Sequence, residues 1–471
     1  MVKDKKNKYP RIVIAGTHSG VGKTTLTIGL LLAFKKKGIA VQPYKVGPDY
    51  IDSAFHSMIA GRACRNLDSF LLSEDVLLEL FERQAQVSEF SIVEGVMGLY
   101  DGIGQQAQTG STAHASKILK APVVLIIDCG KMSGSAGAVA LGYKKFDSKV
   151  RISGCILNKI ASPSHYKIAK QSVEQKSGIE VLGYFPKNAP ISMSERHLGL
   201  TPVQEVTNKR IYKKITKLVE QHIDIDRLIT IAKSADALPC FRKTIYRKPL
   251  VKKEVSIAVA RDKCFHFYYQ DNLDILEHYG AWLKYFSPLK SKSLPKGVSG
   301  VYIGGGFPEK FAEELAGNKD LRADIKLKSR QGMPVYGECG GLMYLMRELQ
   351  TADKKSFPMV GIFSGKTKMG KGLRMFGYYD VTCVQSNILC VKNSVTKGHV
   401  FHWSYLLQLP KNIPRVFKLQ RRGKTSHDGY IKNNTLASYL HVHFGTNTDF
   451  ASRFVEQCRD YKRKGVQSGN R

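Results

Sequence analysis

Length, composition and charge limit what kind of protein this chain can be. It has 471 residues, 43% of them hydrophobic, which suits two or three domains that each bury a core. No apolar run approaches the roughly 18 residues that a membrane-spanning helix needs, so we expect no membrane partner. The 73 Lys and Arg outnumber the 39 Asp and Glu and leave a net charge of +34.

The basic residues and the cysteines indicate which partners and which cellular compartment to expect. The lysines and arginines form no aromatic-interleaved groove or DNA-reading motif, which favours a generally basic surface over a nucleic-acid partner. The nine cysteines contain no CxxC pair and fit free thiols in a reducing compartment. The charged start, MVKDKKNKYPR, runs directly into an apolar stretch and does not read as a secretory signal. We therefore expect a cytoplasmic protein, with a homodimer as one assembly to consider.

A glycine-rich loop follows the first apolar run. Residues 12–15 are apolar, residues 16–25 read GTHSGVGKTT, and residues 26–34 have the apolar spacing of a helix. Strand, glycine loop and helix in this order form a phosphate cradle, in which backbone N–H groups and the helix N-terminus face a polyphosphate. Lys23 can reach the β- and γ-phosphates, and Thr24 can bind Mg²⁺. The residues expected to bind ATP in this loop are Gly16, Thr17, Gly20, Gly22, Lys23, Thr24 and Thr25.

The N-terminal half alternates between strand-like and helix-like segments. This alternation predicts an α/β fold with a parallel, doubly wound sheet. The predicted strands are residues 11–15, 40–44, 90–93, 122–128, 151–157 and 180–185. Such sheets bind ligands at the carboxyl ends of their strands. Asn158 directly follows one strand, at a place where P-loop nucleotidases often put an amide that contacts adenine.

Acidic residues follow two of the predicted strands. Asp49 and Asp52 stand behind a Gly-Pro turn in KVGPDYID, and Glu94 and Asp101 lie in the glycine-rich segment EGVMGLYDG. If Glu94 sits at a strand end opposite Lys23, it can hold Mg²⁺ directly or through water. Asp101 can then help to position the metal or the substrate.

A second α/β unit follows a basic stretch that lacks periodicity. That stretch, residues 239–254, is expected to be a linker, and the next predicted strand is 255–260. Residues 334–345 read PVYGECGGLMYL, an apolar strand that runs into Gly-x-Cys-x-Gly and then a helix. This is the arrangement of a nucleophile elbow with Cys339 in the place of serine. Backbone N–H groups nearby can hold an oxyanion. The expected donors are Gly305, Gly306 and Gly340.

A thiolate nucleophile needs a base, and two histidine pairs are candidates. His441 and His443 lie in ASYLHVHF, where the period of a strand would put both on one face. His399 and His402 in GHVFHW compete for the role.

The motifs, taken in order, resemble a known family. They are GTHSGVGKTT, KVGPDYID, VEGVMGLYDG, GGGFPE, YGECGGL and ASYLHVHF. Together they resemble the cobyrinic acid a,c-diamide synthase family over about residues 11–447. The resemblance implies a P-loop, dethiobiotin synthetase-like ATP-binding domain and a class I glutamine amidotransferase domain. We accordingly expect an ATP-binding domain at 1–238, a linker at 239–254, an amidotransferase domain at 255–455 and a basic tail at 456–471.

The resemblance also implies a reaction and roles for matching residues. The reaction is the ATP-dependent, glutamine-hydrolysing amidation of the a- and c-carboxylates of cobyrinic acid through acyl phosphates. Cys339 would attack glutamine with His441 as its base, and Lys23, Thr24 and Glu94 would serve ATP and Mg²⁺. The residues placed around the reacting carboxylate would be Asp49, Tyr50, Asp52 and Asp101.

One motif departs from the wider class I pattern. Those enzymes usually read His-Pro-Glu, in which the Glu orients the His, whereas this chain reads His441-Val-His443. The third triad position is therefore occupied by a histidine, which resembles the corrin-amidase branch, where a Cys–His dyad does the work. How the tautomer of His441 is fixed stays open at this point.

Three other functions share parts of the pattern. A family member that diamidates nickel-sirohydrochlorin for the methanogenic nickel cofactor would carry nearly the same motifs. A partitioning P-loop ATPase that binds DNA would share the first motif and use the positive charge, but it needs no cysteine elbow. A CTP synthase has the same two-domain logic, yet no base-amination signature is visible.

Overall fold

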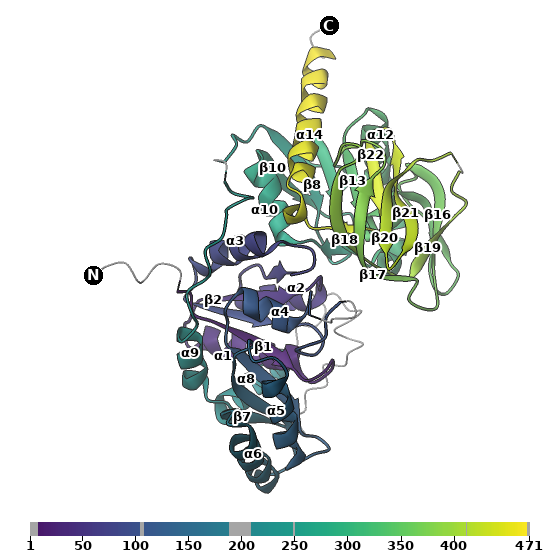
Figure 1. Ribbon diagram of the computed structural model, residues 1–471. Coiled ribbons are helices and arrows are strands. Elements are labelled where there is room, and N and C mark those ends of the chain that lie inside the picture. The colour runs from purple at the N-terminus through teal and green to yellow at the C-terminus, as the bar shows by residue number, and fades with distance from the viewer. Residues whose placement is uncertain (1–7, 104–107, 188–208, 248–249, 411, 469–471) are drawn as a thin grey trace. The chain divides into compact units, whose positions relative to one another are not determined.

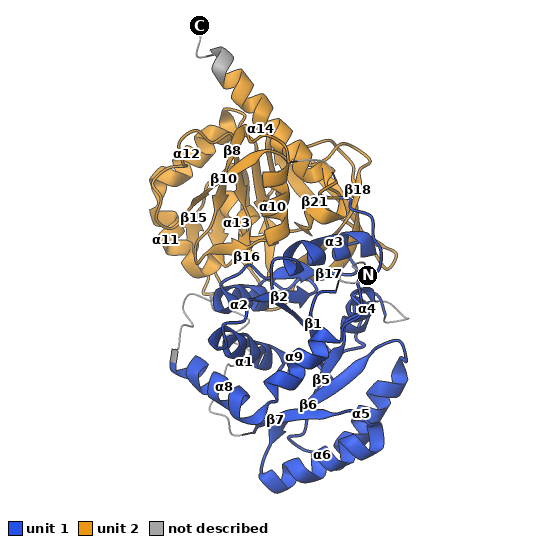
Figure 2. Ribbon diagram, turned by 90° about the vertical axis from the view of Figure 1, so that its left-hand side faces the viewer, with its two compact units in different colours: residues 1–244 blue, residues 245–471 orange. Residues whose placement is uncertain are grey.

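The computed structural model describes residues 8–103, 108–187, 209–247, 250–410 and 412–468. The chain forms two compact units, Met1–Thr244 and Ile245–Arg471 (Figures 1 and 2). The division falls inside residues 239–254, the segment predicted as a linker. Among the described residues of that segment there is no helix or strand.

A seven-stranded sheet forms the centre of the N-terminal unit. Its strands follow the order β3-β2-β4-β1-β5-β6-β7, and neighbouring strands run parallel. The six predicted strands are present, which confirms the doubly wound α/β class. The additional strand, β3, has only three residues, RNL, too few and too polar to show a period. The strands are β1 (Arg11–Gly16), β2 (Val41–Val46), β3 (Arg65–Leu67), β4 (Phe90–Glu94), β5 (Val123–Asp128), β6 (Ile152–Ile160) and β7 (Val181–Pro186).

Helices cover this sheet and share its apolar core. The first helix, α1, packs on β1 and also on α8, which comes much later in the chain (Figure 1). Ile12 of β1, Phe34 of α1, Phe55 of α2 and Ile215 of α8 are buried in one cluster. The helices of the unit are α1 (Lys23–Lys36), α2 (Ile51–Ala60), α3 (Glu74–Ala85), α4 (Thr112–Ile118), α5 (Ser135–Phe146), α6 (Pro163–Ser177), α8 (Lys209–His222) and α9 (Ile225–Lys233).

A ten-stranded mixed sheet forms the centre of the C-terminal unit. Its order is β10-β8-β11-β13-β22-β21-β20-β17-β18-β23. The part from β10 to β22 is parallel, and the part from β21 to β23 is antiparallel. The strands are β8 (Val255–Ala260), β10 (Ala281–Phe286), β11 (Gly300–Ile303), β13 (Val335–Glu338), β17 (Met375–Cys383), β18 (Val395–His402), β20 (Arg415–Arg421), β21 (Lys424–Lys432), β22 (Thr435–Ser438) and β23 (His441–Val442).

Two smaller sheets and several helices complete this unit. One sheet pairs β9 (Phe265–Phe267) with β12 (Gly305–Gly306), and the other has the order β15-β14-β16-β19. The strands of the second sheet are β14 (Met346–Gln350), β15 (Ser356–Pro358), β16 (Phe363–Met369) and β19 (Ser404–Leu407). The helices are α10 (Gln270–His278), η2 (Pro308–Phe311), α11 (Ala312–Gly317), α12 (Lys319–Arg330), α13 (Gly340–Leu345), η3 (Phe444–Thr446) and α14 (Asp449–Ser468).

The segment expected to be a basic tail begins inside a helix. Helix α14 continues through residue 456, and residues 469–471 lie outside the described residues. Cys458 is fully buried, and the Arg459 guanidinium donates to the carbonyl of Tyr279. Lys462 donates to the carbonyl of Glu254. These contacts hold the helix against the C-terminal unit well past the expected boundary.

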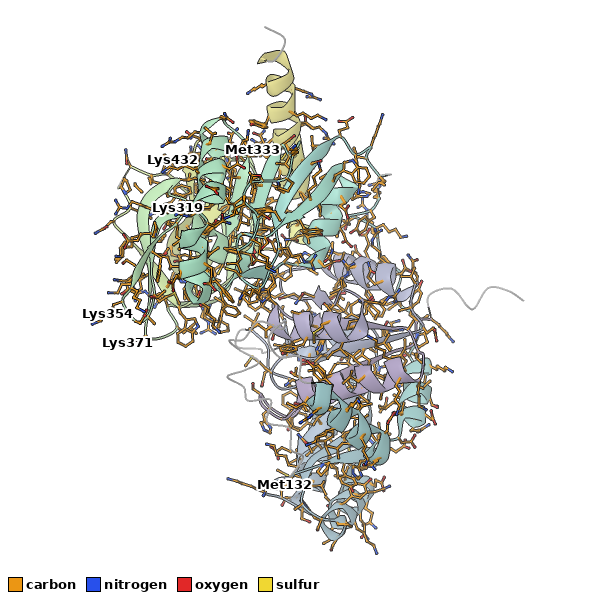
Figure 3. The ribbon with its side chains drawn as sticks, turned by 180° about the vertical axis from the view of Figure 1, so that it is seen from behind. Met132, Lys319, Met333, Lys354, Lys371 and Lys432 are labelled. Carbon is orange, nitrogen blue, oxygen red and sulfur yellow. The ribbon has the colours of Figure 1, made fainter. Side chains whose placement is uncertain are left out.

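Basic residues are spread over the C-terminal unit. Figure 3 shows four lysines at separate places: Lys319 in α12, Lys354 after β14, Lys371 after β16 and Lys432 at the end of β21. All four are exposed. Among the described residues, no helix combines the length and the apolar character that crossing a bilayer requires.

Two helical glycines of the N-terminal unit should respond oppositely to alanine. A Cβ at Gly29 of α1 would lie 2.6 Å from Cγ2 of Val219 in α8, whereas a Cβ at Gly142 of α5 would meet nothing within 4 Å. Gly29→Ala should lower the free energy of unfolding, because overpacking costs about 1–3 kcal/mol and exceeds the helix-propensity gain of about 1 kcal/mol. Gly142→Ala should raise it by about 0.5–1 kcal/mol. Urea unfolding of both variants checks this, and shifts of the same sign would contradict the packing described for α1 and α8.

Candidate active site

The glycine loop after β1 leaves the start of α1 open. Helices α3, α4 and α6 each begin at a serine whose side chain accepts a backbone N–H, but α1 begins at Gly22 without such a cap. Gly22 has φ +102°, and a Cβ there would lie 2.4 Å from Nδ2 of Asn158. At Gly16 a Cβ would lie 2.3 Å from Cγ1 of Val21. The loop therefore requires glycine at both positions and presents uncapped N–H groups to an anion.

Lys23 points back over this loop. Its ammonium donates to the carbonyls of Met97 and His18, and the residue is only 7% exposed. Burial, together with the nearby charge of Lys45, lowers the pKa of Lys23 to about 8. The ammonium is thus held by weak neutral partners, which a polyphosphate can replace.

A buried cluster of charges lies beside Thr24 at the carboxyl ends of β2 and β4. The Thr24 hydroxyl donates to Oε1 of Glu94 at 2.8 Å and to Oδ2 of Asp52 at 3.3 Å. Lys45 lies between the same two carboxylates, 3.0 Å from each. Nε2 of His56 lies 2.6 Å from Oε2 of Glu94.

The two carboxylates of this cluster differ in protonation. Burial alone would favour neutral Glu94, but Lys45 and His56 hold its pKa well below the usual range. Burial and the neighbouring Asp49 raise the pKa of Asp52 to about 7. One hydroxyl and two carboxylates around a cation are the hard oxygen donors that Mg²⁺ prefers, so the residues fit this metal.

The residues expected around a reacting carboxylate hold the surrounding loops. Oδ1 of Asp49 accepts the backbone N–H groups of Ile51 and Asp52, each at 2.9 Å, and starts α2. Tyr50 is the N-cap residue of that helix. Oδ2 of Asp101 accepts the N–H of Gly98 at 2.8 Å. The exposed Asp101 and the half-buried Asp49 and Tyr50 remain at the rim of the same sheet edge.

A cavity of about 200 Å³ lies next to the glycine loop. Its lining includes Gly20, Gly22, Thr25, Asn158 and Lys187. Nδ2 of Asn158 donates to the carbonyl of Val21 at 2.7 Å, so the amide also fixes the loop. The cavity is therefore where a base attached to the bound phosphates can lie. Thr17, whose carbonyl accepts the Tyr143 hydroxyl, is not part of this lining.

In the C-terminal unit, Cys339 stands at a sharp turn between β13 and α13. Its backbone has φ +51° and ψ −100°, a strained conformation for a residue other than glycine that costs about 1–3 kcal/mol. A Cβ at Gly337 would lie 2.5 Å from Leu345, and one at Gly341 would lie 2.1 Å from the carbonyl oxygen of Ile303. Glycines on either side thus permit the elbow.

The glycine segment after β11 lies against the elbow. A Cβ at Gly340 would lie 2.9 Å from the backbone nitrogen of Gly306, and one at Gly305 would lie 3.0 Å from Cε1 of His441. Tyr268 fixes the segment, since its hydroxyl accepts the N–H of Gly304 at 2.8 Å. Gly305, Gly306 and Gly340 are therefore together at the nucleophile, as an oxyanion site requires.

His441 lies between Cys339 and an acid that the sequence interpretation did not assign. Nδ1 of His441 is 2.7 Å from Oε1 of Glu338, the residue directly before the nucleophile. Cys339 also hydrogen-bonds the imidazole. Burial works against the charged imidazole, but Cys339 and Glu338 together raise the pKa of His441 to about 10. The site therefore favours the protonated imidazole of His441 beside the sulfur of Cys339.

His443, which stands where the class I pattern has glutamate, does not contact His441 through the hydrogen bonds of its ring. Strand β23 ends at Val442, so the alternation of a strand stops there, and His443 begins η3. Its Nδ1 accepts the N–H of Gly445 at 3.0 Å, and its ring lies against Tyr269. His443 therefore shapes the next turn, and Nδ1 of His441 has Glu338 as its partner instead.

The competing histidines His399 and His402 are buried, and burial holds both pKa values down. Nδ1 of His402 is 2.6 Å from the carbonyl oxygen of Ser404, and its ring stacks on Tyr439 at 3.8 Å. Burial lowers the pKa of His399 to about 3 and that of His402 to about 4. Both are therefore neutral near pH 7, whereas Cys339 hydrogen-bonds the His441 imidazole.

Three charged partners escaped the sequence interpretation. Lys45 and Glu338 stand inside the motifs KVGPDYID and YGECGGL, beside residues whose roles those motifs predict. His56 lies one turn into α2 and had no motif to mark it. For Lys45 and Glu338 the available signal was a charged residue at the end of a predicted strand, because such a residue is rarely buried without a partner.

Comparison with family models supports the same division of labour. Residues 12–200 match the CobQ/CobB/MinD/ParA nucleotide binding domain. Residues 256–449 match the CobB/CobQ-like glutamine amidotransferase domain. The first region contains the glycine loop and the buried charge cluster, and the second contains Cys339, His441 and Glu338.

Three curated relatives match almost end to end. A cobyrinate a,c-diamide synthase of Listeria monocytogenes serotype 4b (strain F2365) is 43% identical over 442 residues, covering 93% of this chain and 97% of the relative. Those of Dehalococcoides mccartyi (strain ATCC BAA-2266 / KCTC 15142 / 195) and Priestia megaterium are each 40% identical. Each covers 96% of this chain, and the chain covers 99% and 98% of them. With both domain types present in one chain, the protein belongs to the cobyrinate a,c-diamide synthase family of glutamine-dependent amidotransferase ligases.

Proposed function

We propose that this chain uses ATP and glutamine to amidate the a- and c-carboxylates of cobyrinic acid through acyl-phosphate intermediates. The observation that carries the proposal is the presence, in one chain, of an uncapped phosphate loop and a cysteine elbow with its histidine. The names of the relatives that match over 93–96% of the chain supply the substrate. The reaction needs no nucleic acid, and we place it in the cytoplasm, where its co-substrates are made.

The N-terminal unit would activate the carboxylate. Ammonia cannot displace oxide from a carboxylate, so one carboxylate oxygen attacks the γ-phosphorus of ATP and ADP leaves, giving an acyl phosphate. Lys23 and the N–H groups from Gly16 to Thr25 would neutralise and orient the phosphates. Ammonia then adds to the acyl carbon, the bond from that carbon to the phosphate oxygen breaks, and inorganic phosphate leaves.

Mg²⁺ would be held by Thr24 and Glu94, with Asp52 adjoining. When bound, the metal supplies charge neutralisation for the phosphate oxygens. Lys45 and His56 keep Glu94 ionised, so this carboxylate is ready to bind a cation at any pH near neutrality. Asp49, Tyr50 and Asp101 would face the reacting carboxylate at the rim of the same site.

The C-terminal unit would release ammonia from glutamine. The Cys339 thiolate attacks the amide carbon, and Gly305, Gly306 and Gly340 offer backbone N–H groups to the oxyanion. The His441 imidazolium gives its proton to the departing nitrogen, and ammonia leaves. Water then cleaves the glutamyl thioester, with His441 as the base that takes the water's proton.

The first prediction separates substrate from chemistry. Purified protein with ATP, Mg²⁺ and glutamine should convert two carboxylates of cobyrinic acid into amides. Each conversion replaces OH by NH2, so mass spectrometry should show two successive decreases of about 1 Da. Cys339→Ala should lose glutamine-dependent amidation but keep the reaction with ammonium salts, because ammonia bypasses the thiolate. Lys23→Ala should lose both, because activation needs the phosphate loop.

Nickel-sirohydrochlorin offered in a parallel tube tests the alternative tetrapyrrole. Amidation of that macrocycle in place of cobyrinic acid would replace the proposed substrate while leaving the chemistry intact. Amidation of neither would overturn the assignment to tetrapyrroles.

The second prediction concerns pH. Because the pKa of Lys23 is about 8 in the ligand-free protein, the ammonium loses its proton as the pH rises from 7 to 9. Phosphates favour the charged form, so ATP affinity should fall over this interval, approaching tenfold per pH unit above the pKa. Calorimetry in two buffers of different ionisation heat should show proton uptake on binding at about pH 8.5. Lys23→Arg, which keeps its charge, should bind ATP without this pH dependence. A wild-type ATP affinity that stays constant from pH 7 to 9 would contradict the role given to the Lys23 ammonium.

A further inference from the structure

Two buried tyrosines converge on the acid that contacts His441. Tyr336 and Glu338 are two residues apart on β13 and so share one face of the strand. Tyr302 on β11 is the direct parallel-sheet partner of Tyr336, and the two rings stack with centroids 5.0 Å apart. The register of two neighbouring strands therefore brings both phenols to one carboxylate.

The two oxygens of Glu338 have different partners. Oε2 accepts the hydroxyl of Tyr336 at 2.8 Å and that of Tyr302 at 3.3 Å. Oε1 lies 2.7 Å from Nδ1 of His441. Glu338 is 1% exposed, and both tyrosines are fully buried. The carboxylate is thus held from both ends in a place that water does not reach.

We propose that Glu338 is the positioning residue of the glutaminase centre and that Tyr336 and Tyr302 clamp it in the orientation that fixes His441. The inference rests on the proposed function, since it deepens the role of the Cys339–His441 pair. Glu338 accepts a hydrogen bond from the Nδ1–H of His441, which leaves Nε2 as the ring nitrogen that exchanges a proton with the sulfur. The tyrosines hold the other oxygen, so the carboxylate cannot rotate away.

The chemistry of the phenols fits this role. Burial, followed by the nearby charge of Glu338, raises the pKa of both Tyr336 and Tyr302 well above the ordinary value. The two hydroxyls therefore stay protonated and can only donate to the carboxylate. Hydrogen bonds to an ionised acceptor are about twice as strong as neutral ones, and three of them compensate for removing Glu338 from water.

A purely structural carboxylate in the same unit looks different. The buried Asp428 accepts the hydroxyl of Ser438 and the backbone N–H groups of Tyr439 and Leu440. Its donors tie a strand end to the following turn. Those of Glu338 are side chains, one of them the proposed catalytic base, so its contacts set the direction of an imidazole.

The test is the pH dependence of glutamine hydrolysis without tetrapyrrole or ATP, together with histidine NMR. Glu338→Gln keeps the shape of the side chain but removes its charge. We expect glutaminase kcat to fall by about 100-fold, within the range that general acid–base catalysis contributes. The pKa of His441 should fall, and ammonium-dependent amidation should be unchanged. Tyr336→Phe should reduce kcat several-fold and move the pH profile in the same direction, and Tyr302→Phe should do so less.

Tyr344→Phe is the matched control. Tyr344 is a buried tyrosine of α13 in the same unit, and its hydroxyl has no hydrogen-bond partner among the described residues. Removing that hydroxyl should leave the pH profile and kcat unchanged.

The outcomes distinguish a failure of the proposed function from a failure of the role given to Glu338. Wild-type protein that hydrolyses no glutamine overturns the proposed function. Active wild type with an unchanged pH profile in Glu338→Gln overturns this inference alone. Equal losses in Tyr336→Phe and Tyr344→Phe would also overturn it, because they would show a general packing effect.

Discussion

Buried charge at the carboxyl ends of parallel strands is the constraint on which both sites depend. A lone ion in such a place would be driven to its neutral form or would destabilise the fold. Glu94 is fully buried, yet Lys45, His56 and Thr24 surround it. Glu338 is equally hidden and has two phenols and an imidazole. In each unit the partners that make burial tolerable also fix the direction of a reactive group.

The two units use this constraint in different ways. In the N-terminal unit Lys45 lies 3.0 Å from the carboxylates of both Asp52 and Glu94, and under the proposed function Thr24 and Glu94 would also hold Mg²⁺. The neighbouring Lys23 ammonium donates to two carbonyls, which the phosphates of ATP would replace under the proposed function. In the C-terminal unit the partners of Glu338 are fixed by strand register, and only the protons of Cys339 and His441 need to move.

The sequence predicted what short-range patterns encode. Apolar runs and glycine spacing were sufficient to predict six strands of the first sheet and the fold class of both units, because each of these features lies within a short stretch of sequence. Strand β3 was missed because three residues carry no period. The role of Glu338 was missed because two of its three side-chain partners, Tyr302 and His441, are 36 and 103 residues away, in β11 and β23. Pairings set by strand order, such as β11-β13-β22, are not visible in a linear motif.

The position of the acid explains why a histidine can stand at residue 443. In a His-x-Glu motif the acid lies two residues after the base in the chain, and the fold must place the nucleophile next to both. Here Glu338 directly precedes Cys339 in the chain. Strand β22 pairs with β13 at Glu338 and Ser438, and this pairing places His441, three residues after Ser438, next to Glu338 and Cys339. The positive φ of Cys339 turns the sulfur out of the strand while Glu338 remains in register. Residue 443 is thereby released from the catalytic centre and serves to begin η3.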